Sequence, residues 1–405
     1  MCIAVLRAAN TGVTYDEAYT YLHYVHPGFF RSFFGEYQLL NNHVLYSLCA
    51  MILEFATNMR FSEILLRTPS LVAGAIYLCF ACKLSKSFRR CYLVFALFAL
   101  NVYLNEFFTL ARGYGMAAAC VAGALYCFER WRRDARDISM FNFCMGWFCC
   151  AALANSIALY IWCCALPVIG VLIRRAGMLK SYFKNPFNAL FTAVAVVVCA
   201  FNVYVSRKGM PVYSNHDFYI SIIMSIPRMM FETQIAVYIF AALAAALFAV
   251  SLVKQHVSNE YLVMLIIYAG ICAAGQWIFH RGYPVDRTML PVYPLFVLGV
   301  AKAINQTGPG PHIWIERAAM TLVVILFLQF SAKISINHTR DWSDSYLLRA
   351  DVLRYIATHA LSGESEDDFK NFEAGFRLNA PPGRDLNNPV ISFYFGKLKY
   401  MMGRE

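Results

Sequence analysis

The chain has 405 residues, of which 60% are hydrophobic and only 15% are charged. Soluble globular domains are typically about 45–50% apolar and about 25% charged, so this composition excludes an ordinary soluble protein. The net charge of +11 comes mostly from basic residues in short loops between apolar runs. Membrane topology explains that excess better than nucleic-acid binding does, and no nucleic-acid partner is expected.

Apolar runs of membrane-spanning length recur along almost the whole chain. Most approach the roughly 20 residues that a helix needs to cross a bilayer, and they do not alternate as barrel strands would. The expected spans are 66–83, 91–110, 113–129, 140–154, 157–173, 187–205, 235–253, 261–279, 288–303 and 314–333. The sequence therefore predicts an all-α polytopic membrane protein.

The region before the first of these spans has a mixed character. Met1–Ala9 is apolar but only about half as long as a spanning helix, so we expect either an incomplete first helix or a segment that only dips into the bilayer. Within 38–59, the run Val44–Phe55 is apolar but follows a polar stretch, and a crossing here would invert the later topology. We therefore predict an interfacial helix, which makes 10–65 an outer loop.

Basic residues decide the orientation, because positively charged loops favour the cytoplasmic side. They occur in every second loop, at Lys83, Lys86, Arg89, Arg90, Arg130, Arg132, Arg133, Arg136, Arg174, Arg175, Lys180, Lys184, Lys254 and Lys302. The outer side then holds 10–65, 206–234, 280–287 and the tail. The chain divides into a membrane domain, 1–335, and an extramembrane tail, 336–405, in which an amphipathic helix is expected from Tyr346 to Leu361.

Polar side chains collect at the outer ends of the predicted helices, where they could line one outward-facing cavity. They are Asp16, Glu17, Asn41, Asn42, His43, Arg67, Arg112, Tyr114, His280, Arg281, Tyr283, Asp286 and Arg287. Arginine offers a planar, permanently charged fork that suits a phosphate at a membrane edge. A carboxylate pair at the same edge is costly to keep unless it has a function.

Each of these features also has a simpler interpretation. Asp16 and Glu17 fit the first turn of a helix that is capped by Thr14, where acids complement the helix dipole. An arginine at a helix end can extend to the lipid headgroups. A divalent metal ion held by Glu17 and His43 is a further interpretation, which their spacing does not establish.

Several short stretches, taken in order along the chain, resemble motifs of the GT-C superfamily of integral-membrane glycosyltransferases. The similar branch contains protein O-mannosyltransferases and the lipid A aminoarabinose transferase. The stretches are Tyr15-Asp16-Glu17-Ala18-Tyr19, Asn41-Asn42-His43-Val44-Leu45, Glu63-Ile64-Leu65-Leu66-Arg67-Thr68-Pro69-Ser70, Ala111-Arg112-Gly113-Tyr114-Gly115 and Tyr283-Pro284-Val285-Asp286-Arg287. The chain departs from the usual pattern at Val44, where these proteins have proline.

The resemblance implies a GT-C-type helix bundle that transfers a sugar, most commonly mannose, from a polyprenyl phosphate donor. The acceptor would be a protein, lipid or glycan at the outer face of a bacterial cytoplasmic membrane, and membrane lipids would surround the bundle. Asp16 is the expected base, with Glu17 beside it. Arg112, Tyr114, Arg287, Arg67 and Arg281 are expected to bind the donor phosphate, and Tyr19, Asn42, His43, His280 and Tyr283 to line the substrate pocket.

The chemistry is consistent with a single essential carboxylate. A glycosidase needs a second carboxyl group to protonate a poor leaving group, whereas a polyprenyl phosphate leaves as a stabilised anion. One base is then sufficient to take the proton of the attacking hydroxyl, and one displacement inverts the anomeric centre. Two other classes remain open from the sequence: a transporter or flippase of lipid-linked glycans, and a noncatalytic membrane subunit.

Overall fold

The computed structural model describes residues 1–28, 43–134, 137–155, 165, 169–170, 182, 184–208, 214–231, 233–253, 259–279, 283–284, 286–306, 313–334 and 389–401. These residues form a helical bundle with one short antiparallel pair of strands, β1 (Ser214–Asn215) and β2 (Tyr283–Pro284). The all-α fold class predicted from the sequence is confirmed.

The N-terminal helices are mostly short, and most of the longer helices of the bundle follow them. They are α1 (Cys2–Asn10), α2 (Tyr15–Thr20), the π-helix η1 (Tyr21–Val25), α4 (Val44–Thr57), α5 (Glu63–Ser85), α6 (Cys91–Ala99), α7 (Val102–Phe107), α8 (Gly113–Arg133), α9 (Ile138–Ala154), α12 (Pro186–Lys208), η2 (Tyr219–Ile223), α13 (Ser225–Met230), α14 (Gln234–Val253), α15 (Glu260–Phe279), the 3₁₀ helix η3 (Asp286–Val292), α16 (Tyr293–Gln306), α17 (Ile313–Lys333) and α20 (Pro389–Met401).

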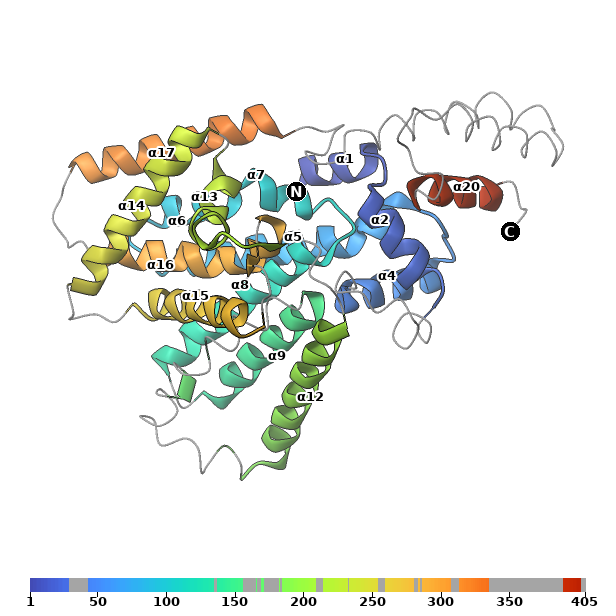
Figure 1. Ribbon diagram of the computed structural model, residues 1–405, viewed down its shortest axis with the longest axis horizontal. Helices are drawn as coiled ribbons and strands as arrows, with labels where there is room; N and C mark the ends of the chain where they lie inside the picture. Colours follow the sequence, from blue (N-terminus) through green and yellow to red (C-terminus); the bar gives the residue numbers. More distant parts are fainter. Residues whose placement is uncertain are drawn as a thin grey trace.

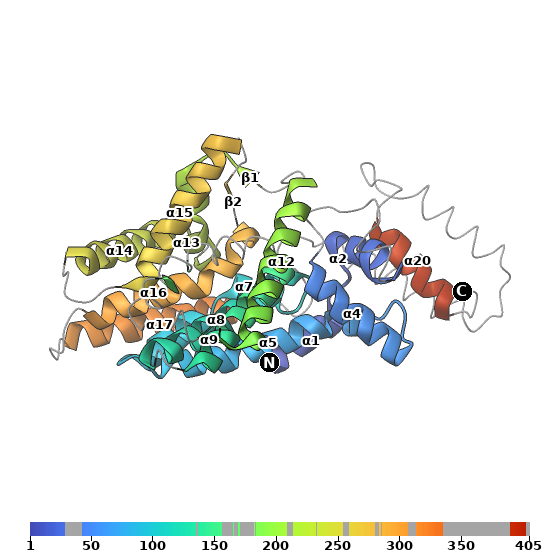
Figure 2. The same ribbon diagram turned by 90° about the horizontal axis from the view of Figure 1, so that it is seen from below.

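The centre of the bundle is α8, which is buried along almost its entire length and packs against α5, α9 and α16 (Figure 1). Small residues occupy much of this helix, so its neighbours approach closely, as is common between membrane helices. In Figure 1, α14 and α17 lie on one side of this centre, and α2, α4 and α20 gather at the far end. Figure 2 shows the same grouping from below.

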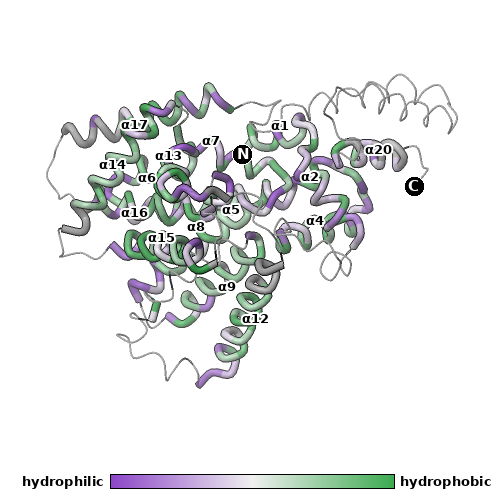
Figure 3. The backbone as a smooth tube through the Cα atoms, viewed as in Figure 1, coloured by the Kyte–Doolittle hydropathy of each residue, from purple (hydrophilic) through white to green (hydrophobic). Residues whose placement is uncertain are grey.

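The structure agrees with a membrane location. Among the described residues, three segments are long and apolar enough to cross a bilayer: Glu63–Ser85, Glu260–Ile278 and Asp286–Asn305. Shorter apolar helices accompany them, and hydrophobic residues run along most of the bundle helices (Figure 3). The chain is therefore an integral membrane protein. Most of the predicted span 157–173 and the predicted tail helix lie outside the described residues.

The prediction of one continuous span over 91–110 was wrong. The chain leaves the helix after Ala99, and α7 begins only at Val102. Asn101 causes the break, because its Oδ1 accepts a hydrogen bond from the backbone N of Leu104 at 2.9 Å and so caps a new helix. α7 in turn presents Glu106, whose carboxylate lies 2.5 Å from the guanidinium of Arg7 on α1.

The last described helix packs at the same end of the bundle as α2. The Tyr394 hydroxyl accepts a hydrogen bond from Val13 N at 2.9 Å and donates one to Glu63 Oε1 at 3.0 Å. Lys397 pairs with the other oxygen of Glu63 at 3.0 Å. Phe393 is fully buried between aromatic rings of the N-terminal segment. α20 therefore helps to hold the loop that carries the acidic pair.

Gly113 lets the start of α8 approach two other segments. A Cβ atom at this position would lie 2.3 Å from the carbonyl oxygen of Ala154 and 2.6 Å from the side chain of His43. The Arg-Gly-Tyr motif therefore owes its glycine to close packing between α8, α9 and the residue that precedes α4.

We expect Gly113→Ala to destabilise the purified protein by about 1–3 kcal/mol, because a backbone oxygen must move to admit the new methyl group. Gly270→Ala is the matched control, since no atom lies within 4 Å of its Cβ position. Thermal unfolding in detergent followed by circular dichroism checks both variants. Equal melting temperatures for Gly113→Ala and the wild type would contradict this packing.

Candidate active site

The start of α2 gives the two adjacent carboxylates different surroundings. Thr14 caps the helix and accepts a hydrogen bond from Glu17 N at 3.3 Å, while Glu17 Oε2 accepts one from Thr14 N at 2.8 Å. This reciprocal pair is a capping box. The helix-cap interpretation of the sequence therefore describes Glu17, and successive helical residues point in different directions, so Asp16 faces elsewhere.

Arg67, in the first turns of α5, is completely buried and holds Glu17 in a two-pronged ion pair. Its Nε donates to Glu17 Oε1 at 2.8 Å, and its Nη2 donates to Glu17 Oε2 at 2.7 Å. The remaining donors reach backbone carbonyls at the end of α1 and in the α1–α2 connection, at Ala8, Thr11 and Gly12, over 2.7–2.8 Å. A guanidinium has five N–H groups, and each of them has an acceptor here.

The Glu17 carboxylate is as fully occupied as its partner. Besides Arg67 and Thr14, it accepts a 2.6 Å hydrogen bond from the backbone N of Ala111, just before α8. Burial alone would raise the pKa of Glu17, but the charge of Arg67 and these hydrogen bonds outweigh burial and hold the pKa below its usual range. An ionised carboxylate offers about four acceptor positions, and all are filled by the protein.

These contacts weigh against three assignments made from the sequence: phosphate binding by Arg67, and catalysis or metal binding by Glu17. Arg67 would have to abandon Glu17 to bind a phosphate, and Glu17 would have to abandon Arg67 to bind a metal ion or a proton. Removing one partner of a buried pair costs about 3–5 kcal/mol. The contacts favour a structural role for Arg67 and Glu17, and the acceptor positions of Glu17 that a metal ion would need are already filled. Within the described ranges, no three His, Cys, Asp or Glu side chains cluster as metal ligands do.

Asp16 lies between two other arginines. Its Oδ2 accepts a hydrogen bond from Arg287 Nη1 at 2.9 Å and lies 3.5 Å from Arg112 Nη2. Arg112 Nη1 also lies 3.4 Å from the backbone oxygen of Asp16 and from Thr20 Oγ1. The Asp16 side chain is 8% exposed. Three elements that are remote in sequence thus bring one nearly buried carboxylate and two guanidinium groups together.

The position of Arg287 depends on the segment before α14. Asp286 has a left-handed backbone (φ 49°), and its N donates to Ser225 Oγ at 3.4 Å. α13 packs on η3 and so fixes the turn that aims Arg287 at Asp16. Sequence reasoning missed Ser225, because no short motif marks it. The positive φ of Asp286 was equally hidden, although aspartate adopts this conformation more readily than most residues.

His43 and Tyr114 lie beside Arg112. His43 Nδ1 lies 2.8 Å from the carbonyl oxygen of Ala154, so Nδ1 carries the proton and Nε2 is left with its lone pair. Burial, together with the charge of Arg112, lowers the pKa of His43 well below its usual value. Its ring meets Tyr114 edge-on at 4.7 Å, and the Arg112 guanidinium lies 5.5 Å from the Tyr114 ring. His43 is thus neutral and rigidly placed.

Of the other residues predicted to line the site, the structure describes Tyr19 and Tyr283. Tyr19 lies about one helical turn after Asp16, and its ring centroid is 4.2 Å from that of His23. Tyr283 lies in β2 and contacts the ring of Phe218 at 5.3 Å. Asn42, His280 and Arg281 lie outside the described residues.

Comparisons with known proteins identify the fold. No family model and no curated protein matches the sequence. The structure resembles ArnT from Cupriavidus metallidurans bound to undecaprenyl phosphate, with a TM-score of 0.53 and 11% sequence identity over 98% of this chain and 83% of that one. It also resembles ArnT from the same organism in the apo state, with a TM-score of 0.50 and 10% identity over 100% of this chain and 74% of that one. The chain has the GT-C membrane fold.

We expect Arg67→Ala to destabilise the protein by about 3–5 kcal/mol, because it leaves Glu17 buried without its cation. Arg67→Lys should recover only part of that loss, since one ammonium cannot replace the donors that reach Glu17 and three carbonyls. Arg60→Ala removes an exposed arginine from the connection between α4 and α5 and serves as the control. Thermal unfolding compares the three variants; a wild-type melting temperature for Arg67→Ala would disprove the structural role.

Proposed function

We propose that this protein is a membrane glycosyltransferase that moves a sugar from a polyprenyl phosphate to an acceptor hydroxyl, with Asp16 as the base. The observation that carries the proposal is the nearly buried Asp16 carboxylate, set between Arg112 and Arg287 at one end of the bundle. The fold supports it, because ArnT has a similar fold and has been crystallised with undecaprenyl phosphate.

The two arginines suit the leaving group. As the bond between the anomeric carbon and the phosphate oxygen breaks, negative charge grows on the phosphate, and fixed cations close to it lower the barrier. Arg112 and Arg287 come from the starts of α8 and η3, so both are held by rigid elements. Both arginines pair with Asp16, which keeps their charges from being buried without a partner.

Asp16 suits the attacking group. The proton of the acceptor hydroxyl passes to the carboxylate as its oxygen bonds to the anomeric carbon, and the polyprenyl phosphate leaves as an anion. One displacement of this kind inverts the configuration and needs no general acid. Glu17 holds α2 in place through Arg67 and the Ala111 amide, so it acts as a positioning residue rather than as a second base.

The finer assignments follow from the motif resemblance and from the location of the site. The site lies at the ends of apolar helices, where a donor with a long hydrocarbon tail can enter from the bilayer, each buried CH₂ contributing about 0.8 kcal/mol. The loop charges favour the outer face of a bacterial cytoplasmic membrane for this end. A mannose-like sugar and a protein, lipid or glycan acceptor are the substrates proposed.

Asp16→Asn keeps the shape of the side chain and removes the base, so we expect sugar transfer to fall about 10²–10⁴-fold with the melting temperature little changed. Transfer from a radiolabelled polyprenyl-phosphate sugar by the purified protein measures it, over a panel of sugars and acceptors. Asp134→Asn, an exposed carboxylate at the other end of α8, is the control. Wild-type transfer by Asp16→Asn would eliminate Asp16 as the base. A lipid-glycan transporter or a noncatalytic subunit would show no transfer even in the wild type.

Arg287→Ala should weaken use of the donor about 10–100-fold, because it removes a charged hydrogen bond worth about 1.5–3 kcal/mol. The expected change is in the KM for the polyprenyl phosphate donor, with the KM for the acceptor unaffected. Arg228→Ala is the matched control, an exposed arginine on the adjacent α13. If the donor KM of Arg287→Ala equals that of the wild type, Arg287 does not contact the phosphate.

A further inference from the structure

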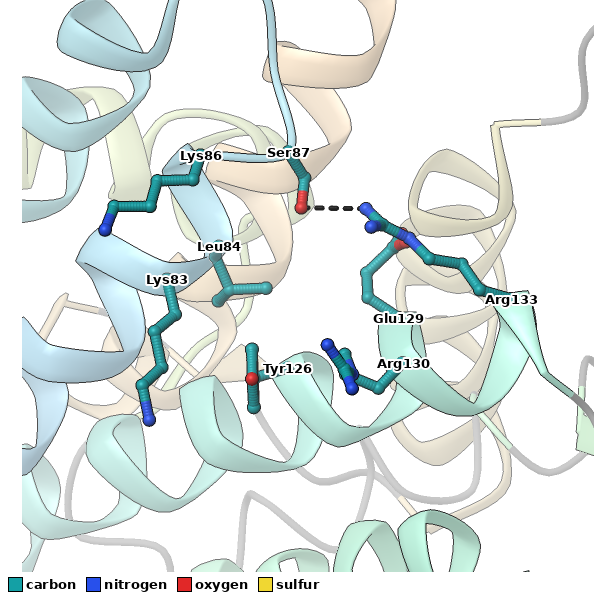
Figure 4. Close-up of a pocket in the computed structure, with 8 residues that line it drawn as sticks. All are labelled: Lys83, Leu84, Lys86, Ser87, Tyr126, Glu129, Arg130 and Arg133. Atoms are coloured by element: carbon teal, nitrogen blue, oxygen red, sulfur yellow. Dashed lines mark hydrogen bonds between the residues drawn. The ribbon is translucent and has the colours of Figure 1, made fainter. Parts of the chain in front are cut away.

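A second group of cations borders a cavity at the opposite end of the helices that carry Arg67 and Arg112. The cavity has a volume of about 260 Å³ and lies between the end of α5 and the end of α8 (Figure 4). Its lining residues are Lys83, Leu84, Lys86, Ser87, Tyr126, Glu129, Arg130 and Arg133. Four of these eight side chains are cationic, and only Glu129 is acidic.

The acidic residue is already engaged elsewhere. Glu129 pairs with Arg132 at 3.0 Å, and its other oxygen accepts a hydrogen bond from the buried hydroxyl of Tyr261. Across the part of the chain that the structure describes, no carboxylate lies within ion-pair distance of Lys83, Lys86, Arg130 or Arg133. The cavity therefore carries an excess of positive charge, because Glu129, its one acidic lining residue, is paired with groups outside the cavity.

The neighbouring cations at this end, in contrast, have carboxylate partners. Lys302 pairs with Glu260, which also lies 3.9 Å from Arg132. A network of acids thus neutralises the basic side chains on the α15–α16 side of α8. The cations on the α5 side are left to solvent or to a ligand, so the imbalance is local to the cavity rather than general to this end.

Two of the four cations are also held in position. Arg133 Nη2 donates a hydrogen bond to Ser87 Oγ at 2.8 Å, which ties the end of α8 to the turn after α5 (Figure 4). Lys83 Nζ lies 5.4 Å from the ring of Tyr126 and 5.7 Å from that of Phe80, within range of a cation–π interaction. Side chains that only oriented the protein in the bilayer would need positive charge in the loop, but would not need to border one cavity.

The cavity lies at the opposite end of α8 from the Asp16 site. Arg112 precedes α8 and Arg130 lies in its last turn, so the two are roughly 27 Å apart along the helix, close to the thickness of the hydrocarbon core. Basic pockets between membrane helices at the cytoplasmic surface are suited to the phosphate of an anionic lipid headgroup. A soluble phosphate compound would present the same chemistry to these side chains.

We propose that the cavity formed by Lys83, Lys86, Arg130 and Arg133 is a second phosphate-binding site, separate from the proposed donor site. Arginine and lysine supply the charge-assisted hydrogen bonds that a phosphate accepts, and Tyr126 supplies a wall. The proposal does not depend on the glycosyltransferase function, since none of these residues contacts the Asp16 group in the described structure.

The test compares full-length wild type with the double variant Lys83→Gln/Arg130→Gln and with Lys184→Gln. Lys184 is an exposed lysine just before α12. It lies at the same end of the bundle as the cavity, because Asn142 near the start of α9 donates a hydrogen bond to Asn188 of α12 at 2.8 Å. Each protein is placed in nanodiscs of phosphatidylcholine alone or with phosphatidylglycerol, and the phosphatidylcholine samples are also titrated with inorganic phosphate and pyrophosphate. Thermal shifts and the lipids retained in native mass spectrometry are the readouts.

We expect phosphatidylglycerol or a soluble phosphate to bind wild type and Lys184→Gln equally, and to bind the double variant about 25-fold more weakly, since each of the two lost basic contacts contributes about fivefold. Binding of phosphatidylglycerol alone identifies a lipid headgroup as the ligand, and binding of inorganic phosphate or pyrophosphate in pure phosphatidylcholine identifies a soluble one. Equal binding by wild type and the double variant would overturn the proposal, as would binding by neither. An unchanged melting temperature without ligand shows that the double variant is folded.

Discussion

The end of the bundle that holds Asp16 depends on the ion pair between Arg67 and Glu17. Both side chains are removed from water, which is costly for each charge alone. The pair is stable because every donor and acceptor is used: the arginine reaches the α1–α2 connection, and the glutamate reaches Thr14 and Ala111. One interaction therefore joins α5, the first loop and the approach to α8. The neighbouring Asp16 takes its direction from a helix start that this pair fixes.

The same helices carry basic residues at both ends, and the two ends use them in opposite ways. Near Asp16 the arginines are nearly buried, so each pairs with a carboxylate. Near Lys83 and Arg130 the side chains are exposed, and water screens their charge. A buried arginine that exchanges its carboxylate partner for a phosphate suits a step in which charge moves. An exposed cluster with no carboxylate partner in the described residues suits reversible binding of a headgroup.

Helix positions were largely predictable because a bilayer demands long apolar segments, as α5, α8, α9 and α12 illustrate. The exception, 91–110, failed because hydropathy averages over a window and conceals one capping residue, Asn101. The order of the motifs along the chain also indicates the GT-C fold. Arg67, Arg112 and Arg287 could not be told apart in the same way: each is an arginine at a helix end, and only its neighbours reveal whether its donors are already used.

The sequence by itself determined that this protein is a membrane helix bundle, and it indicated an acidic stretch, compatible with a helix start, before the first predicted span. Those properties depend on local composition and on the spacing of neighbouring residues. Only the tertiary structure decided which carboxylate of the pair is structural, because the answer depends on Arg67, Ala111, Arg112 and Arg287, which are remote from it in sequence. A carboxylate's role follows from the groups that surround it, and packing places those groups.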